Sequence, residues 1–311
     1  MTSHIPDTTN AGPTSPTVTA PIVFAAPERG DDLQLRVTAP ATGRGLPVIV
    51  FSHGFGYSMD GYVPLVQAWA ADGFAVIQPT HLDSRTLALA SDDPRTPHIW
   101  RSRIEDRVRV LDALDLIEGS VASLHGRLDR TRLALAGHSW GATTASALIG
   151  ARIVDPAGRV GPSVTDPRIT SAVLIAVAGT GGDDLTPFAA ENLAYMNPEF
   201  TQMTAPALIL AGDQDHSPLS VRGPGWWTDA YHLSAAPKAL LTLFGAEHSM
   251  GGITGYHDPE TTDESPERVA LLQRASTAYL HHTLELNREP WTRLQNELAA
   301  DSGALGRIDS K

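Results

Sequence analysis

The sequence has no cysteine among its 311 residues, which excludes disulfide bonds and cysteine-ligated zinc or iron–sulfur centres. It also lacks any run approaching the roughly 20 apolar residues of a membrane-spanning helix. Basic residues are the minority, with 23 Lys and Arg against 35 Asp and Glu and a formal net charge of −12. An acidic surface disfavours nucleic acid and anionic membranes as partners. These absences favour a globular protein without a membrane span.

The first 21 residues lack the basic region and the apolar stretch of a signal peptide and are rich in Thr, Pro and Ser. We therefore expect a disordered tail over residues 1–17 and a cytoplasmic protein, with a mature secreted form as the alternative. Residues 18–311 are predicted to form a single domain, because 42% of the chain is hydrophobic and this length suits one large core. The oligomeric state is left open.

Apolar runs alternate with helix-forming segments along most of the chain. Strands are predicted at residues 21–25, 33–38, 47–51, 74–78, 132–136, 172–177, 207–211 and 239–244. The later runs are continuously apolar, which is typical of parallel strands buried on both faces. Helices are predicted at 60–72, along an apolar stripe over 104–117, and along a C-terminal stripe over 269–279. Asp112, Asp115 and Glu118 are expected largely on the wet side of the second helix. The pattern predicts the α/β class, with a mostly parallel, twisted sheet of about eight strands and helices on both faces.

A serine lies at the junction of one such strand and the helix that follows it. Residues 137–141 read G-x-S-x-G, directly after the apolar run 132–136 and before the helix-forming run 142–149. Glycines two residues on either side allow strand and helix to approach, while the turn holds the serine in a strained conformation at the sheet edge. Ser139 is therefore a candidate nucleophile. The alternative is an ordinary helix N-cap, which does not require flanking glycines.

Candidates for an acid and a base follow in chain order. The run 207–211 leads into Asp213 and Asp215, and the run 239–244 leads into His248. A serine hydroxyl needs a base within hydrogen-bonding reach, and that base needs an acid on its other ring nitrogen. His257 is the alternative base. Asp183 and Asp184, after the sixth strand, are further alternatives for the acid.

The order Ser, Asp, His is the one found in α/β-hydrolases, and the chain resembles that superfamily from about residue 18 to about residue 286. The stretch 47–79, with HGFGYSMDGY after one strand, looks most like the branch of dienelactone-hydrolase-like enzymes, chlorophyllases, polyester hydrolases and platelet-activating-factor acetylhydrolases. In the superfamily, the acid follows the seventh strand in the pattern G-x-x-D. Gly212 and Asp215 have this spacing, so the resemblance favours Asp215 over Asp213. The HG-x-G loop implies that the N–H groups of Phe55 and Trp140 form an oxyanion hole. Dienelactone hydrolase itself uses cysteine, which this chain lacks.

Three insertions are expected to border the site as short cap loops, at residues 81–100, 179–203 and 217–237. The third contains Trp226 and Trp227, which are predicted to wall a pocket for the acyl or leaving group. In the alternative interpretation, one indole packs the loop onto the core and the other is half exposed.

These features predict a serine hydrolase that cleaves carboxylic esters through a Ser139–His248–Asp215 triad and an acyl-enzyme intermediate. The substrate is expected to be a small-molecule or polymeric ester. Other uses of such a site are acyl transfer, thioester or amide cleavage and cofactor-free peroxidation; a non-catalytic binding module is the alternative of a different class. The predicted reaction needs no organic cofactor. No metal is expected either, because His81, Asp83 and His98 do not have the spacing of metal ligands.

Overall fold

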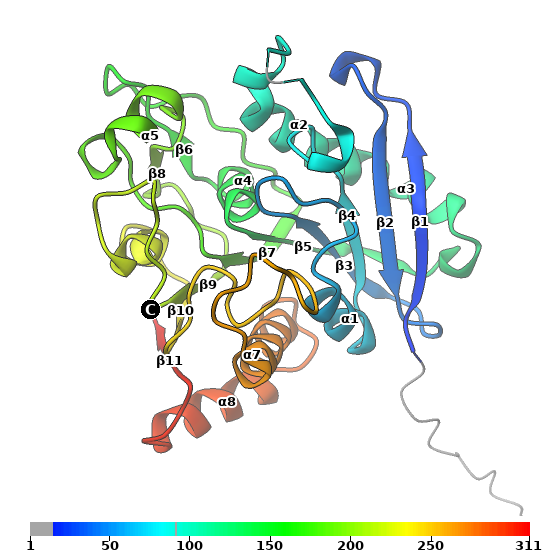
Figure 1. Ribbon diagram of the computed structural model, residues 1–311. Coiled ribbons are helices and arrows are strands. Elements are labelled where there is room, and N and C mark those ends of the chain that lie inside the picture. Colours follow the sequence, from blue (N-terminus) through cyan, green and yellow to red (C-terminus); the bar gives the residue numbers. More distant parts are fainter. Residues whose placement is uncertain (1–14, 91) are drawn as a thin grey trace, which may run out of the picture.

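The centre of the protein is a nine-stranded sheet in the order β1-β2-β4-β3-β5-β7-β9-β10-β11 (Figure 1). This computed structural model describes residues 15–90 and 92–311. The strands are β1 (Thr17–Phe24), β2 (Leu33–Ala39), β3 (Leu46–Ser52), β4 (Ala75–Pro79), β5 (Leu128–His138), β7 (Ile169–Ile175), β9 (Ala207–Gly212), β10 (Lys238–Leu243) and β11 (Gly306–Ser310). All pairs from β4 to β10 are parallel, whereas β1, β2 and β11 pair in antiparallel fashion at the two edges.

The inner strands contain the apolar runs from which strands were predicted. Every residue of β3, β4 and β9 is buried, as expected for strands covered on both faces. Because these strands are parallel, their carboxyl ends share one edge of the sheet. The loops that leave this edge carry the candidate site.

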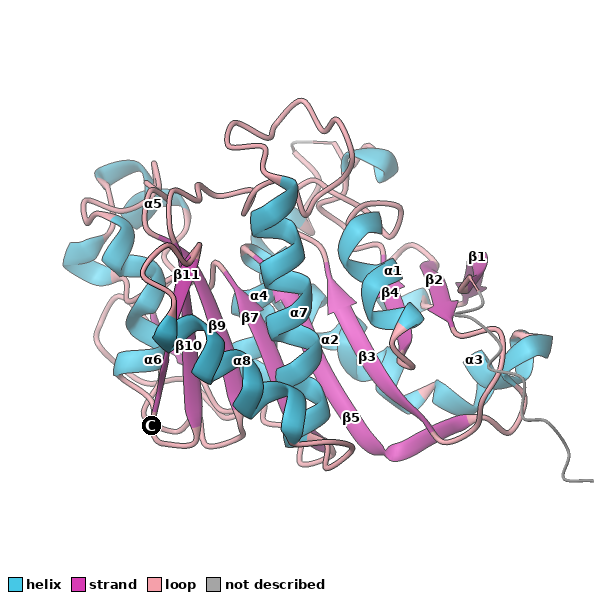
Figure 2. Ribbon diagram, turned by 90° about the horizontal axis from the view of Figure 1, so that it is seen from below, coloured by secondary structure: helices cyan, strands magenta, loops and turns pink. Residues whose placement is uncertain are grey.

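Helices cover both faces of this sheet. They are α1 (Val63–Ala71), α2 (Ile99–Asp112), α3 (Leu114–Ser120), α4 (Trp140–Leu148), α5 (Pro187–Asn192), α6 (Asp229–His232), α7 (Pro266–Thr283) and α8 (Glu289–Ala300). Figure 2 shows α1, α7 and α8 in front of the sheet and α2 and α4 behind it. The predicted fold class is confirmed, with nine strands in place of about eight.

Three features differ from the sequence-based expectation. The helix over 104–117 is broken at Ala113, which ends α2 and begins α3. Glu118, expected on the wet side, is buried because its carboxylate accepts the N–H groups of Arg127 and Leu128 at 2.7 and 2.9 Å. Helix α8 and strand β11 were not predicted. The sequence of β11, GRIDS, is largely polar, and it becomes a strand by pairing with the edge of β10.

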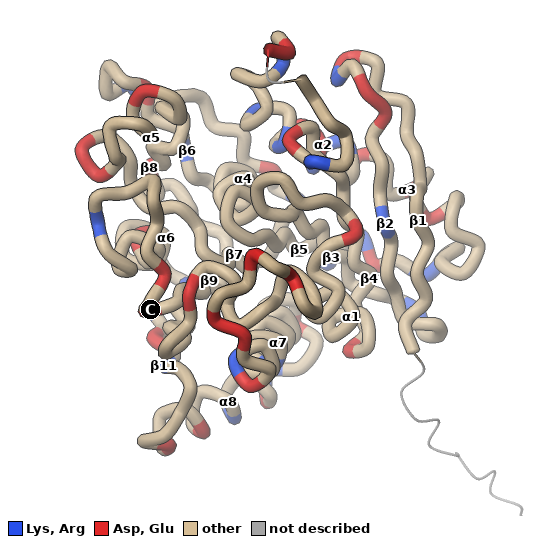
Figure 3. The backbone as a smooth tube through the Cα atoms, viewed as in Figure 1, with Lys and Arg blue, Asp and Glu red and all other residues tan. Residues whose placement is uncertain are grey.

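At the amino terminus, the tail predicted over residues 1–17 lies mostly outside the described residues, which begin at 15. Thr17 belongs to the domain, because it starts β1 and its hydroxyl donates to the carbonyl of Ala39 at 3.2 Å. Among the described helices, none is long and apolar enough to cross a membrane. Along the described chain, Lys and Arg are interspersed with acidic residues, and several arginines lie together on α2 (Figure 3).

The second and third predicted cap loops are joined to each other. Leu185 and Ser220 form a β-bridge, and the N–H of Thr186 donates to the carbonyl of Leu219 at 2.9 Å. Arg222 pairs with Asp184 at 3.1 Å and with Asp229 at 2.7 Å. A two-stranded sheet of β6 (Arg152–Ile153) and β8 (Pro198–Glu199) also ties the second loop to the segment after α4. The two loops therefore form one cap beside the sheet edge.

Candidate active site

Ser139 lies at the apex of a sharp turn between β5 and α4. Its φ and ψ are 54° and −121°, a strained conformation for a residue with a side chain. A Cβ atom on Gly137 would lie 2.4 Å from the carbonyl carbon of Gly141, and one on Gly141 would lie 2.1 Å from the carbonyl oxygen of Ser52. Both glycines are therefore needed for strand, helix and neighbouring loop to approach this closely.

The Ser139 side chain does not cap α4 and instead lies next to His248. Ser139 Oγ and His248 Nε2 are 3.0 Å apart, and His248 Nδ1 is 2.8 Å from Oδ2 of Asp215. The Asp215 carboxylate thus fixes the tautomer in which Nδ1 carries the proton and Nε2 accepts from the serine. The side chain of Asp215 is 2% exposed, whereas that of His248 is 42% exposed, so solvent reaches the imidazole but not the carboxylate.

The alternative acids and base lie elsewhere. Asp213 accepts the N–H of Gly245 at 2.7 Å, which ties the ends of β9 and β10 together. Asp184 pairs with Arg222 in the cap, and Asp183 is exposed. His257 is exposed on the loop after β10. Among these residues, the structure brings only Asp215 and His248 into one line with Ser139.

The loop that contains Phe55 passes beside this turn. A Cβ atom on Gly54 would lie 3.6 Å from that of Ser139, and the ring centroids of Phe55 and Trp140 are 5.9 Å apart. The N–H of Trp140 is at the first position of α4, where no intrahelical acceptor exists. None of the described backbone acceptors takes the N–H of Phe55. Both amides predicted to form the oxyanion hole are therefore available to a ligand.

A hydrogen-bonded chain joins the three segments that carry these groups. The N–H of Gly54 donates to the hydroxyl of Tyr62 at 2.9 Å, and that hydroxyl lies 2.8 Å from Nδ1 of His138. His138 Nε2 in turn donates to the carbonyl of His248 at 2.8 Å. His138, the residue before Ser139, is thus hydrogen-bonded to the backbone of His248, and no local sequence motif indicates this contact between distant segments.

His138 and His53 are buried as neutral imidazoles. Burial lowers the pKa of His138 to about 3 and that of His53 to about 4, from an ordinary value of 6.5. Each uses one ring nitrogen as an acceptor: His138 from Tyr62, and His53 from the N–H of His81 at 3.0 Å. Protonation would remove these acceptors and place an unpaired charge in the interior.

These pKa shifts predict acid sensitivity. A histidine whose pKa is depressed on folding binds a proton more readily when unfolded, so its stabilising contribution is complete above about pH 6.5 and is lost as the pH falls. We expect His138 to account for a loss of about 2 kcal/mol in the free energy of unfolding between pH 7 and pH 5. Urea unfolding of the wild type and of His138→Gln at both pH values measures this loss, which should be absent from the variant. Equal losses in the two proteins would contradict it.

The residues considered for a metal are engaged with other partners. His81 Nδ1 lies 2.9 Å from Asp106 Oδ2, and Nε2 lies 2.8 Å from the hydroxyl of Ser52. Asp83 pairs with Arg103, and His98 is exposed. Among the described residues, no group of three His, Asp or Glu side chains is arranged to hold a metal ion. The expectation that no cofactor is needed stays a prediction.

Trp226 and Trp227, predicted to wall a pocket, are both buried, with exposures of 0% and 4%. Trp226 Nε1 donates to the carbonyl of Thr180 at 2.8 Å and so joins the two cap loops. Trp227 Nε1 donates to the carbonyl of Asp215 at 2.9 Å, and its ring centroid lies 4.9 Å from that of His248. Their burial does not fit a wall open to substrate, nor the alternative of one half-exposed indole. Trp227 instead packs against His248 and holds the backbone of Asp215.

This arrangement predicts different effects for the two indoles. Trp227→Phe keeps a ring against His248 but removes the donor to Asp215, so we expect kcat to fall about 10-fold for all esters alike. Trp226→Phe loses an equivalent hydrogen bond to Thr180 and should cost about 1 kcal/mol of stability with little change in kcat. Kinetics over a series of esters, with thermal unfolding of each variant, measures both. A changed ranking of substrates in Trp227→Phe would instead support the pocket wall.

Asp263 was not identified from the sequence. Its Oδ2 accepts the N–H groups of Glu247 and Gly251, at 2.8 and 2.9 Å, and so holds the turn that carries His248. Glu247 itself points away from the site, toward the hydroxyl of Thr262. An acidic residue 15 positions beyond the histidine carries no sequence signal for this role, because the loop between them has no regular spacing.

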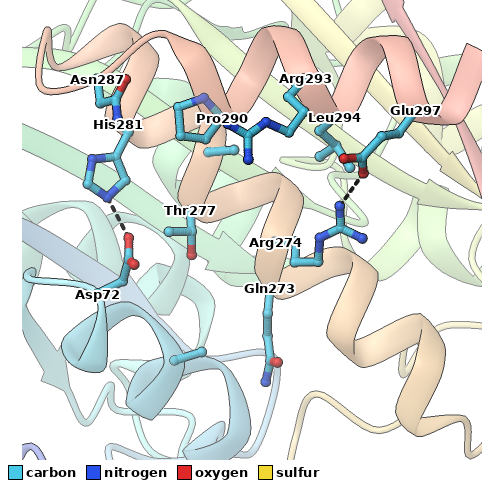
Figure 4. A pocket seen from close by; sticks show the side chains of 12 residues that line it. Asp72, Gln273, Arg274, Thr277, His281, Asn287, Pro290, Arg293, Leu294 and Glu297 are labelled. Carbon is cyan, nitrogen blue, oxygen red and sulfur yellow. Dashed lines mark hydrogen bonds and ion pairs between the residues drawn. The ribbon is translucent and has the colours of Figure 1, made fainter. Parts of the chain in front are cut away.

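A separate cavity of about 520 Å³ lies between α1, α7 and α8, away from the turn of Ser139 (Figure 4). Its lining mixes apolar and polar residues, and some of the charged ones are paired: Arg274 contacts Glu297 at 2.5 Å, and His281 contacts Asp72. No candidate catalytic residue lines it.

Comparison with known families adds to this geometry. The sequence model of the chlorophyllase family matches residues 16–156, which include the loop of Phe55, the turn of Ser139 and strands β1 to β5. Chlorophyllase is an α/β-hydrolase-type family, and the mostly parallel sheet with helices on both faces agrees with it. The chain thus has the α/β-hydrolase fold. The match supports ester hydrolysis as the general activity of this α/β-hydrolase. A search of curated proteins found no match to the chain.

Proposed function

We propose that this α/β-hydrolase is a serine esterase that cleaves carboxylic esters through an acyl-enzyme at Ser139. The observation that carries the proposal is the unbroken line Ser139 Oγ–His248–Asp215, with steps of 3.0 and 2.8 Å. The N–H groups of Phe55 and Trp140, for which no described residue is an acceptor, lie in the two segments next to the same hydroxyl. This is the donor arrangement that stabilises a tetrahedral oxyanion.

In the first half-reaction, Ser139 Oγ attacks the ester carbonyl while Nε2 of His248 takes the hydroxyl proton. The N–H groups of Phe55 and Trp140 hold the carbonyl oxygen as it becomes negative. His248 then gives its proton to the departing alcohol, and Asp215 stabilises the imidazolium throughout. The acyl group is left on Ser139.

Water completes the cycle by attacking the acyl-enzyme, with His248 again as the base. The exposure of the His248 side chain, 42%, places the base in contact with solvent. This access favours hydrolysis over transfer of the acyl group to a second alcohol, because transfer requires that water be kept away from the base.

The substrate surface next to Ser139 is aromatic. Phe55 is 62% exposed, and its ring contacts Trp140. Trp140 stacks on Tyr195 at 5.8 Å, and Tyr195 stacks on Trp100 at 6.0 Å. These partly exposed rings favour an ester with an apolar acyl or alcohol part, in a small molecule or a polymer. The chlorophyllase match ends at residue 156, so the segment of Tyr195 lies outside the part of the chain that resembles that family.

Two measurements test the proposed function. Hydrolysis of p-nitrophenyl esters from acetate to palmitate gives kcat/KM as a function of acyl length, which we expect to rise from acetate to longer chains. An organophosphonate should label one residue stoichiometrically, and peptide mass spectrometry should locate the label on Ser139. Labelling of another residue, or no hydrolysis of any ester, would overturn the proposal.

A further inference from the structure

The peptide groups on both sides of the Phe55 N–H are held by buried side chains. The N–H of Gly56 donates to Oδ2 of Asp83 at 3.0 Å. The carbonyl of His53 accepts from Nη2 of Arg103. The loop is therefore anchored on both sides of the Phe55 N–H, for which no described residue is an acceptor. These two anchors set the orientation of that N–H group.

Arg103 and Asp83 act as one unit. Nη1 of Arg103 lies 3.0 Å from Oδ1 and 2.9 Å from Oδ2 of Asp83, and the two side chains are 0% and 2% exposed. Arg103 comes from α2, whereas Asp83 comes from the loop after β4. A charged pair so deeply buried is rigid, because leaving either partner without the other is costly.

The same guanidinium also contacts the second half of the oxyanion hole. Its central carbon lies 4.8 Å from the ring centroid of Trp140, in the geometry of a cation–π contact. Arg103 thus contacts the loop that carries the Phe55 amide and the residue that carries the Trp140 amide. The planar fork of arginine suits three such contacts at once, and a lysine ammonium does not.

We propose that Arg103 and Asp83 are the positioning residues of the oxyanion hole, an inference that rests on the proposed esterase function. Neither residue touches substrate. They hold the amides of Phe55 and Trp140 at the separation that a tetrahedral oxyanion requires. Because the oxyanion forms only in the transition state, their loss lowers kcat and leaves KM nearly unchanged. Loss of an ion pair with only a structural role would lower stability without lowering kcat selectively relative to KM.

The test compares Arg103→Lys and Asp83→Asn with Arg101→Lys. Arg101 is a matched control because it is exposed on the same helix and its guanidinium also lies over an indole, Trp100, at 5.2 Å. For the first two variants we expect kcat to fall about 100-fold, the cost of misplacing a catalytic group by roughly 1 Å, with KM within about threefold of the wild type. The inhibition constant of an alkyl boronic acid, whose adduct with Ser139 places an oxygen in the hole, should rise in parallel. Arg101→Lys should change none of these.

Two further measurements distinguish the proposed positioning role from misfolding of the variants and from failure of the proposed esterase function. Arg103→Met/Asp83→Leu removes both charges together and leaves no unpaired ion, so it should fold and show the same loss in kcat and boronate affinity. Amide exchange at Gly56 should accelerate in Arg103→Lys whether or not the protein is an esterase. Unchanged kcat and boronate affinity in the folded double variant, or unchanged exchange at Gly56 in Arg103→Lys, would overturn the inference. Activity retained by Ser139→Ala would instead overturn the proposed function.

Discussion

Replacing Ser139 with alanine should lower kcat for ester hydrolysis by roughly 10⁴–10⁶, the cost of removing the nucleophile from a serine triad. The fold should persist, because the change removes one partly exposed hydroxyl and leaves both flanking glycines in place. The measurement is steady-state hydrolysis of p-nitrophenyl esters, together with thermal unfolding to show that the variant is native.

Organophosphonate labelling supplies the control for this variant. The wild type should gain one label per chain, and Ser139→Ala should gain none. Ser163→Ala, which changes an exposed hydroxyl outside the site, should be labelled and should turn over like the wild type. Activity of Ser139→Ala within about tenfold of the wild type would exclude Ser139 as the nucleophile.

Asp215→Asn should lower kcat by about 10⁴. An asparagine presents an amide where the Nδ1 proton of His248 needs an acceptor, so the imidazole turns to the tautomer that cannot take the serine proton. The carboxylate of Asp215 is 2.8 Å from that nitrogen and is shielded from solvent, so no water substitutes for it.

Asp213→Asn is the matched comparison, because Asp213 lies two residues earlier and its carboxylate accepts the N–H of Gly245 instead. An asparagine oxygen can still accept that hydrogen bond, so kcat should stay within about tenfold of the wild type and the melting temperature should fall by a few degrees at most. A larger loss of kcat in Asp213→Asn than in Asp215→Asn would contradict the assignment of the acid.

Much of the fold was predictable because its strands are strongly patterned. The runs at the centres of β3, β7, β9 and β10 are predominantly apolar, and burial on both faces of a parallel sheet favours that composition. Strand β11 has no such pattern, since it lies at an antiparallel edge and depends on its partner β10 for its hydrogen bonds. The break of the predicted helix at Ala113 was missed for a similar reason, because the apolar stripe continues from α2 into α3.

The candidate nucleophile, acid and base could be predicted because each follows a strand within a few residues. The turn at Ser139 needs glycines at fixed offsets, and this requirement is visible in the sequence. The choice between Asp213 and Asp215 rested on the superfamily pattern, and the structure places only the second beside His248.

Local pattern was thus enough for the α/β class, the order of the inner strands along the chain and the residues at the strand ends, because period, glycine spacing and burial act over a few residues. Tertiary structure alone decided which polar groups support them. Arg103, Asp83, Asp263 and Trp227 reach the site from segments far apart in the chain, and their roles follow from hydrogen bonds that form only when the sheet brings its loops together. Trp226, expected in a pocket wall, is instead buried inside the cap. The composition of one loop does not indicate that it packs against another loop.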